Sequence, residues 1–150
     1  MVHLSREGQE EIFDHARQGY PAECCGIVTE GGSDTFRVYR CDNIQDRLHG
    51  KDPEAHPRSS RTAYRMDGLQ VHRILAETEA AGGRVMAFYH SHIDCDAYFS
   101  QEDRDAATFF GEPTYPGVIY PVVSVVDGDV QGKKVFQWEE GEKGFVEIRV

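Results

Sequence analysis

A short apolar segment in the middle of the chain, RVMAFY at residues 84–89, constrains the fold most strongly. Two glycines precede it, and its length suits a buried strand better than a helix. His90 and His92 therefore fall at the C-terminal end of a predicted core strand. On a helix such neighbours point in different directions, but at a strand end both rings can converge if the backbone bends. The pattern favours two imidazoles that face a single ion.

The segments before this strand predict a helix followed by a hairpin. Ser5, the acids of the next turn and apolar residues at helical spacing predict a capped helix that ends near Gln18. The run at 24–43 is typical of two strands, with Gly-Gly-Ser at 31–33 in the hairpin loop. Glu23 therefore lies just before a predicted strand.

The next segment, residues 42–65, is polar, contains prolines and several arginines, and shows no sustained periodicity. Unstructured loops of this length are uncommon in compact domains and are often functional. We predict that this segment, called the excursion below, lies on the surface and includes one short strand near 62–66. Asp67 then caps a predicted helix that ends at the glycines 82–83.

A further helix and three strands are predicted after the histidines. Ser100 and Asp103 resemble a capping box with Asp in place of Glu, which puts Asp103 in the first turn of a helix. That helix is predicted to continue through 109–110 to Gly111. Apolar segments joined by glycine-containing turns predict strands at 118–127, 133–140 and 145–150. The chain length of 150 residues fits one domain over 1–150.

Composition restricts the classes of partner. The chain has 16 Lys and Arg against 26 Asp and Glu, a net charge of -10, which opposes binding to a nucleic-acid backbone. No apolar run approaches the roughly 18 residues of a membrane span, and the first residues lack the pattern of a signal peptide. We therefore expect no nucleic-acid partner, no membrane anchor and a cytoplasmic location.

The cysteines give no sign of a disulfide framework or a Cys-rich metal site. They form no C-x-x-C pair, and disulfides are rare in cytosolic proteins. Cys95 lies in the loop between the two predicted histidine ligands and Asp103, but a fourth protein ligand would make a zinc site structural and inert. We predict free thiols at all four positions: Cys24, Cys25, Cys41 and Cys95.

Asp103 can bring a carboxylate back to the histidine pair, because its helix is entered after a loop. Two imidazoles and one carboxylate with a fourth position open are typical of catalytic zinc. Such a site also needs a general base, and Glu23 is our candidate, although spacing alone does not select it over the acids beside Asp103. Hydrogen-bonded histidines at a strand end and a surface carboxylate at Glu23 are the alternatives that these residues leave open.

The complete pattern resembles the signature of the JAMM/MPN-type metalloproteases. His-Ser-His at 90–92, seven intervening residues, Ser100, two more residues and Asp103 form its main part, and PAECCG at 21–26 completes it. The resemblance covers roughly the whole chain. It implies a single-domain α/β/α fold around a mixed β-sheet, related to that of the zinc deaminases.

The resemblance also assigns roles to individual residues. It implies that His90, His92 and Asp103 bind one zinc ion. It further implies that Glu23 is the general acid/base and that Ser100 helps to stabilise the oxyanion.

For the substrate, the resemblance implies hydrolysis at the C-terminal tail of a ubiquitin-like protein. Small stand-alone bacterial members look like partners of ubiquitin-like sulfur carrier proteins, from whose diglycine end they release an amino acid or peptide. The excursion matches in position an insertion beside the tail-binding groove, and its Arg58 and Arg61 could meet acids of the carrier. Ile93 and Phe99 stand where many bacterial members have proline, which leaves the loop shape and its specificity open.

Two other classes of hydrolytic enzyme do not fit the sequence. A zinc deaminase needs H-x-E and P-C-x-x-C, which the sequence lacks, and a TIM-barrel amidohydrolase needs about 200 residues or more. The remaining alternative is a non-catalytic MPN-like scaffold that binds a ubiquitin-like partner. Such scaffolds lack ligands that this sequence retains, so catalysis is favoured. The oligomeric state is left open, with a homodimer among the options.

Overall fold

A mixed β-sheet forms the centre of the computed structural model, which describes residues 4–32 and 36–150. Its strands are β1 (Cys25–Gly31), β2 (Phe36–Cys41), β3 (Gly83–Ile93), β6 (Ile119–Val126), β7 (Asp129–Glu139) and β8 (Gly144–Ile148). Among the described residues, these six strands pair in the order β2-β1-β3-β6-β7-β8. Only β3 and β6 run parallel, and the other neighbouring strands in this described sheet are antiparallel.

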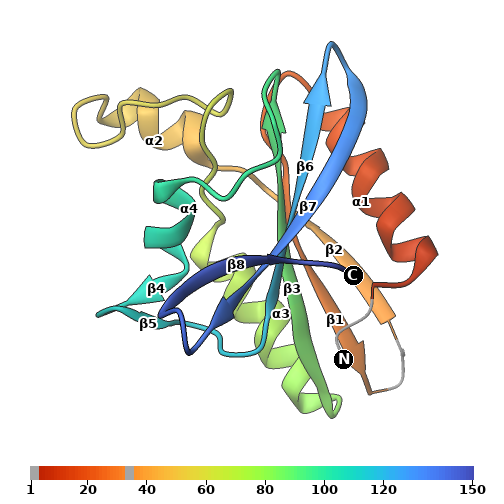
Figure 1. Ribbon diagram of the computed structural model, residues 1–150. Coiled ribbons are helices and arrows are strands. Elements are labelled where there is room, and N and C mark those ends of the chain that lie inside the picture. The colour runs from red at the N-terminus through yellow and green to blue at the C-terminus, as the bar shows by residue number, and fades with distance from the viewer. Residues whose placement is uncertain (1–3, 33–35) are drawn as a thin grey trace.

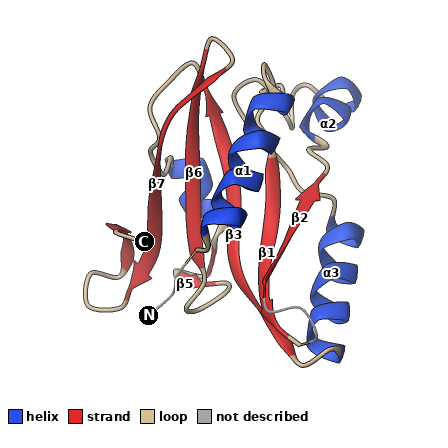
Figure 2. Ribbon diagram, turned by 90° about the vertical axis from the view of Figure 1, so that its right-hand side faces the viewer, coloured by secondary structure: helices blue, strands red, loops and turns tan. Residues whose placement is uncertain are grey.

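Helices cover both faces of this sheet. They are α1 (Arg6–Gly19), α2 (Gln45–Lys51), α3 (Gly68–Ala80) and α4 (Gln101–Ala106). Figure 1 shows α1 on one side of the sheet and α2, α3 and α4 on the other, and Figure 2 shows α1 lying across the strands. This arrangement confirms the predicted α/β/α fold with a mixed sheet. Within the described ranges, no helix is both long and apolar enough to cross a membrane.

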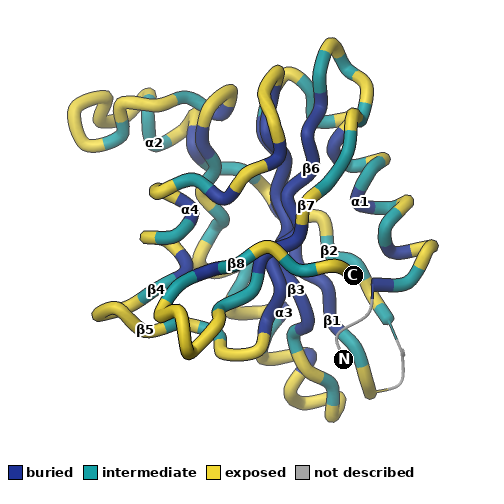
Figure 3. The backbone as a smooth tube through the Cα atoms, in the orientation of Figure 1, coloured by how far each residue is buried: buried dark blue, intermediate teal, exposed yellow. Residues whose placement is uncertain are grey.

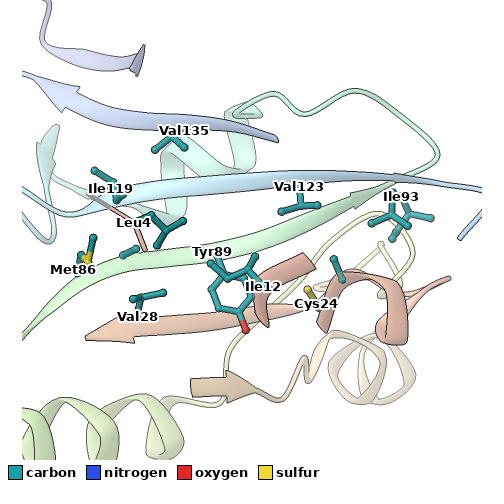
Figure 4. Close-up of a cluster of buried hydrophobic side chains, with 13 residues drawn as sticks. Leu4, Ile12, Cys24, Val28, Met86, Tyr89, Ile93, Ile119, Val123 and Val135 are labelled. Carbon is teal, nitrogen blue, oxygen red and sulfur yellow. The ribbon is translucent and has the colours of Figure 1, made fainter. Parts of the chain in front are cut away.

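Strand β3 is buried on both faces, because successive side chains of a strand point to opposite sides. Tyr89 packs on the α1 side with Ile12, as Figure 4 shows, in a core that also contains Val123. Phe88 packs on the opposite side, in a second core that includes Ile74 of α3. Figure 3 shows the resulting band of buried backbone through β1, β3 and β6.

Two helix starts follow the capping pattern of the sequence. The Ser5 side chain accepts a hydrogen bond from the Gly8 N–H at 3.0 Å. The Asp67 carboxylate accepts one from the Leu69 N–H at 2.9 Å. These bonds satisfy N–H groups that a helix leaves without an internal partner. Both helices are confirmed, and α1 ends at Gly19, one residue beyond the predicted end.

The predicted short strand near 62–66 is wrong. An isolated bridge between Asn43 and Met66 closes the excursion instead, and the excursion contains a helix, α2, that the sequence did not reveal. Tertiary contacts account for this helix, because Asp46 accepts hydrogen bonds from both the N–H and the hydroxyl of Ser60, each at 2.7 Å. A hydrogen-bond partner fourteen residues away leaves no periodic pattern in the sequence of the helix itself.

The helix that begins after Ser100 is shorter than predicted. It ends at Ala106, and a small hairpin follows, formed by β4 (Thr108–Phe109) and β5 (Glu112–Pro113). Phe110 and Gly111 have positive φ angles of 52° and 77°, which suit a tight turn and not a helix. The predicted helical continuation through 109–110 is therefore wrong, and both phenylalanines are exposed.

The remaining predicted strands are confirmed with shifted bounds. Gly31 and Gly32 of the predicted hairpin loop have positive φ angles of 88° and 73°, whereas Ser33 lies outside the described residues. Strand β3 continues to Ile93, beyond the apolar segment that predicted it, so both histidines lie within the strand. The three C-terminal strands correspond to β6, β7 and β8.

Gly26 of β1 provides a test of how closely this sheet packs. It pairs with Tyr89 of β3, and a Cβ atom at this position would overlap the fully buried Tyr89 ring. We expect Gly26→Ala to lower the free energy of unfolding by about 1–3 kcal/mol, as overpacked cores do. The matched control is Gly50→Ala in α2, where no atom lies within 4 Å of the added Cβ. Urea unfolding followed by circular dichroism measures both, and wild-type stability of Gly26→Ala would contradict the packing argument.

Candidate metal centre

His90 and His92 project from the same face of β3, opposite to Tyr89. They occupy alternate positions in a stretch whose register with β6 is regular from His90 to Ile93. Both side chains are buried, and their Nε2 atoms lie 3.3 Å apart. The bent backbone that the sequence argument required is therefore unnecessary, because ordinary strand alternation brings the two rings together.

Asp103 reaches the same point from the first turn of α4. The predicted capping box is present: the Ser100 hydroxyl accepts from the Asp103 N–H, and Asp103 Oδ2 accepts from the Ser100 N–H, both at 3.0 Å. The same Oδ2 atom lies 3.1 Å from His90 Nε2 and 3.4 Å from His92 Nε2. The bonds that begin the helix thus also aim the carboxylate at the histidines.

The three atoms fit the dimensions of a metal site. In a tetrahedral zinc site with bonds of about 2.0 Å, neighbouring ligand atoms are about 3.3 Å apart. The measured separations are 3.1, 3.3 and 3.4 Å. His90, His92 and Asp103 could therefore hold a metal ion.

Neighbouring groups fix the orientation of the rings. His92 Nδ1 lies 3.2 Å from the Asp96 carbonyl oxygen, which can only accept, so Nδ1 carries the hydrogen and Nε2 keeps its lone pair for a metal. Tyr64 stacks on His90 with ring centroids 4.5 Å apart, and Tyr98 contacts His92 edge-on at 4.7 Å. Neither tyrosine carried a signal in the sequence, because both contacts arise from tertiary packing.

The electrostatic environment favours deprotonated ligands. Burial lowers the pKa of His90, so its ring is neutral at ordinary pH. Burial alone would raise the pKa of Asp103, but contacts with the His90 and His92 rings and with the Ser100 N–H outweigh it and hold that pKa below its usual value. A neutral imidazole at His90 and an ionised carboxylate at Asp103 are the protonation states that a metal ion requires of such ligands.

Glu23 has the opposite environment. Its side chain is buried, and this burial, reinforced by the negative charges of Asp103 and Glu102, raises the pKa of Glu23 to about 9. Two nearby carboxyl groups with pKa values moved in opposite directions are a mark of acid/base sites. The structure thus separates a carboxylate suited to hold a cation from a carboxyl group suited to hold a proton.

One cavity of about 190 Å³ brings the predicted site residues together. Its lining includes Glu23, His92, Ser100 and Asp103. His90 does not line it, but is fully buried in contact with His92 and Asp103. The Ser100 hydroxyl uses a lone pair for its cap, and its own hydrogen has no acceptor within the described part of the chain. That hydrogen is therefore free to point toward a substrate.

The excursion supplies positive charge at the same cavity. Arg58 and Arg61 both line it. Arg58 is paired with Glu102 of α4 at 3.2 Å, and Arg61 with Asp94, just after β3, at 3.3 Å. All four side chains are partly or largely exposed, so these pairs add little stability and can exchange partners.

The cysteines are free thiols, as predicted. Cys95 is exposed and lines the cavity. Among the described residues, the cluster of potential metal ligands consists of His90, His92 and Asp103, and Cys95 does not belong to it. The interpretation of Cys95 as a loop thiol agrees with this position.

The sequence profile of prokaryotic homologues of the JAB domain matches residues 5–139. The chain therefore belongs to this family. Its membership confirms the resemblance to JAMM/MPN-type metalloproteases and the predicted class of enzyme, a JAMM-type hydrolase.

Curated relatives give more specific similarities. The chain is 32% identical over 130 residues to a desampylase of Haloferax volcanii, covering 81% of this chain and 78% of the relative. It is 30% identical over 115 residues to CysO-cysteine peptidases of Mycobacterium bovis and Mycobacterium tuberculosis, covering 75% of this chain and 66% of each relative.

Solved structures support the fold. A protein of Desulfitobacterium hafniense superimposes with a TM-score of 0.68 at 24% identity, covering 99% of this chain and 90% of the other. A protein of Salinibacter ruber gives a TM-score of 0.59 at 22% identity, covering 97% and 88%. The α/β arrangement is thus shared over nearly the whole chain.

Metal content tests the three-residue cluster directly. We expect wild-type protein equilibrated with zinc and then dialysed to keep about one ion per chain, since three converging ligands form one site. His92→Ala and Asp103→Ala should lose it, whereas His72→Ala, which alters an exposed histidine of α3, should retain it. Elemental analysis by mass spectrometry measures all four proteins. Full zinc content in His92→Ala would contradict the assignment.

Proposed function

We propose that the protein is a zinc-dependent metallopeptidase or isopeptidase that cleaves an amide bond at the C-terminal diglycine end of a ubiquitin-like sulfur carrier protein. The observation that carries this proposal is the convergence of His90, His92 and Asp103 beside a cavity that the buried Glu23 also lines. The names of the relatives, desampylase and CysO-cysteine peptidase, support a peptidase of this kind. A cytoplasmic location is part of the proposal.

In the proposed reaction, His90, His92 and Asp103 hold one zinc ion, which would polarise the scissile carbonyl and lower the pKa of a water molecule to about 7. Glu23 accepts a proton from the attacking water and later delivers it to the leaving amine. The raised pKa suits the second half of this cycle, in which the carboxyl group holds the proton before delivering it, and the positive charge of the zinc ion would favour the ionised form that the first half needs.

Ser100 has a separate role in this scheme. Its hydroxyl hydrogen donates to the oxygen of the scissile carbonyl as negative charge develops there. The capping bond does not compete with this role, because in that bond the Ser100 oxygen accepts from the Asp103 N–H. One hydroxyl thus serves as helix cap and as oxyanion donor.

The substrate class follows from what surrounds the cavity. A diglycine end has no side chains on the carrier side of the scissile bond, so it can enter a cavity of about 190 Å³ in extended form. Arg58 and Arg61 are placed to meet acids of the carrier once they leave Glu102 and Asp94. This local positive charge offsets the net charge of -10 during association.

The proposal is tested with a diglycine-tailed carrier extended by one amino acid. Zinc-loaded wild type should release that residue, as seen by mass spectrometry of the carrier. Glu23→Gln should keep its zinc and lose turnover by about a hundredfold or more, the usual effect of removing a general acid/base. Glu102→Gln, which changes a largely exposed acid at the same cavity, should retain most activity. Zinc-loaded wild type that cleaves no carrier would instead indicate the non-catalytic scaffold.

Ser100→Ala separates the two roles of Ser100. We expect turnover to fall about a hundredfold to a thousandfold, as after loss of one oxyanion donor, with zinc still bound. Ser5→Ala is the matched control, because it removes the same type of cap, also at 3.0 Å, from α1. Both variants should lose about 1 kcal/mol of stability. If Ser100→Ala loses stability but not turnover, Ser100 acts only as a cap.

A further inference from the structure

We propose that Asn43 is a positioning residue for Glu23, an inference that rests on the proposed function. Its side-chain NH2 group donates to the Glu23 carbonyl oxygen at 2.8 Å and to the Ala63 carbonyl oxygen at 3.2 Å. Its side-chain oxygen accepts from the Gln45 N–H at 3.0 Å and the Arg65 N–H at 3.1 Å. All four hydrogen-bonding positions of the amide are therefore used.

A second contact holds the backbone N–H of Glu23. The Glu23 N–H donates to the Ser60 carbonyl oxygen at 2.7 Å, so both backbone polar groups of Glu23 bond to the excursion. The next residue, Cys24, donates its N–H to the Ser91 hydroxyl at 2.8 Å, and Ser91 lies between the two histidines in β3. The Glu23 backbone is thus fixed relative to both the excursion and the metal ligands.

The position of Glu23 in the fold explains why its backbone needs the hydrogen bonds from Asn43 and to Ser60, which are called the clamp below. Strand β1 begins at Cys25, so Glu23 lies beyond the last residue that pairs within the sheet. Its side chain is buried at the cavity, so the position of its carboxyl group follows that of its backbone. Without the Asn43 donors, the Glu23 carbonyl would also lack a partner among the described residues, which is unfavourable for a backbone carbonyl.

The clamp also joins both ends of the excursion to the proposed general base. Asn43 stands at its beginning, whereas Ala63 and Arg65 stand at its end. None of the contacts of the Asn43 side chain involves the three candidate metal ligands. Loss of its donors should therefore displace Glu23 and leave the metal centre intact.

The test compares two substitutions of an amide by an acid. Asn43→Asp replaces the donor that faces Glu23. Gln137→Glu is the control, because the Gln137 side chain on β7 also donates to a backbone carbonyl oxygen, that of Gly117 at 3.2 Å, and makes no hydrogen bond to Glu23 or to the excursion among the described residues. We expect kcat of Asn43→Asp to fall about tenfold to a hundredfold, with KM and zinc content unchanged, since small displacements of a catalytic group cost rates of this order. Gln137→Glu should stay near wild type.

A double-mutant cycle distinguishes positioning from general structural damage. In the Glu23→Gln background, Asn43→Asp should cause no further loss of the residual activity, because the group that it positions is already gone. Independent, multiplying losses would overturn the proposal. Asn43→Ala removes the donors without adding a charge, and it replaces Asn43→Asp if the latter fails to fold.

Amide hydrogen exchange provides a readout that does not need activity. Exchange in the segment 21–25 should be faster in Asn43→Asp than in the wild type, and unchanged in Gln137→Glu. Unchanged exchange in Asn43→Asp would overturn the positioning role even if the enzyme is active. If the wild type cleaves no carrier, the proposed function fails, while the exchange result still decides whether Asn43 holds Glu23.

Discussion

The double burial of β3 is the constraint on which the rest of the structure depends. One face of this strand packs through Tyr89 against α1, and the other carries Phe88 and the two histidines toward α3 and α4. Because strand alternation is strict, apolar packing on the first face fixes where His90 and His92 point. A slip of one residue would place the histidines in the α1 core, so the core that stabilises the fold also maintains the site.

Local hydrogen bonds then complete the site without additional secondary structure. The capping box at the start of α4 satisfies helix N–H groups and at the same time aims the Asp103 carboxylate at the histidines. On the opposite side of the cavity, Asn43 and Ser60 hold the Glu23 backbone just before β1. Helix capping and loop closure, which are ordinary stabilising interactions, thereby set the geometry of the candidate site.

Sequence reasoning succeeded where the determining interaction is local. Caps at Ser5 and Asp67, and the capping box at Ser100, act over two or three residues, so the helix starts were predictable. It failed where distant contacts decide. Helix α2 depends on hydrogen bonds that Asp46 accepts from a serine fourteen residues away. The end of α4 depends on a turn in which Phe110 adopts a positive φ angle that few residues other than glycine favour.

The sequence by itself determined the chemistry of the site: two imidazoles at alternate positions of a strand, and a carboxylate placed by its own helix cap. Residue spacing left open which acid lies beside them, the resemblance to a known family implied Glu23, and only the tertiary structure brings that residue to the cavity. The pairing of Cys25 with His90 brings the segment before β1 beside the histidines, so Glu23 reaches the cavity from a position far away in the chain. Residue spacing cannot encode this choice, because the register between two strands is set by the packing of the whole sheet.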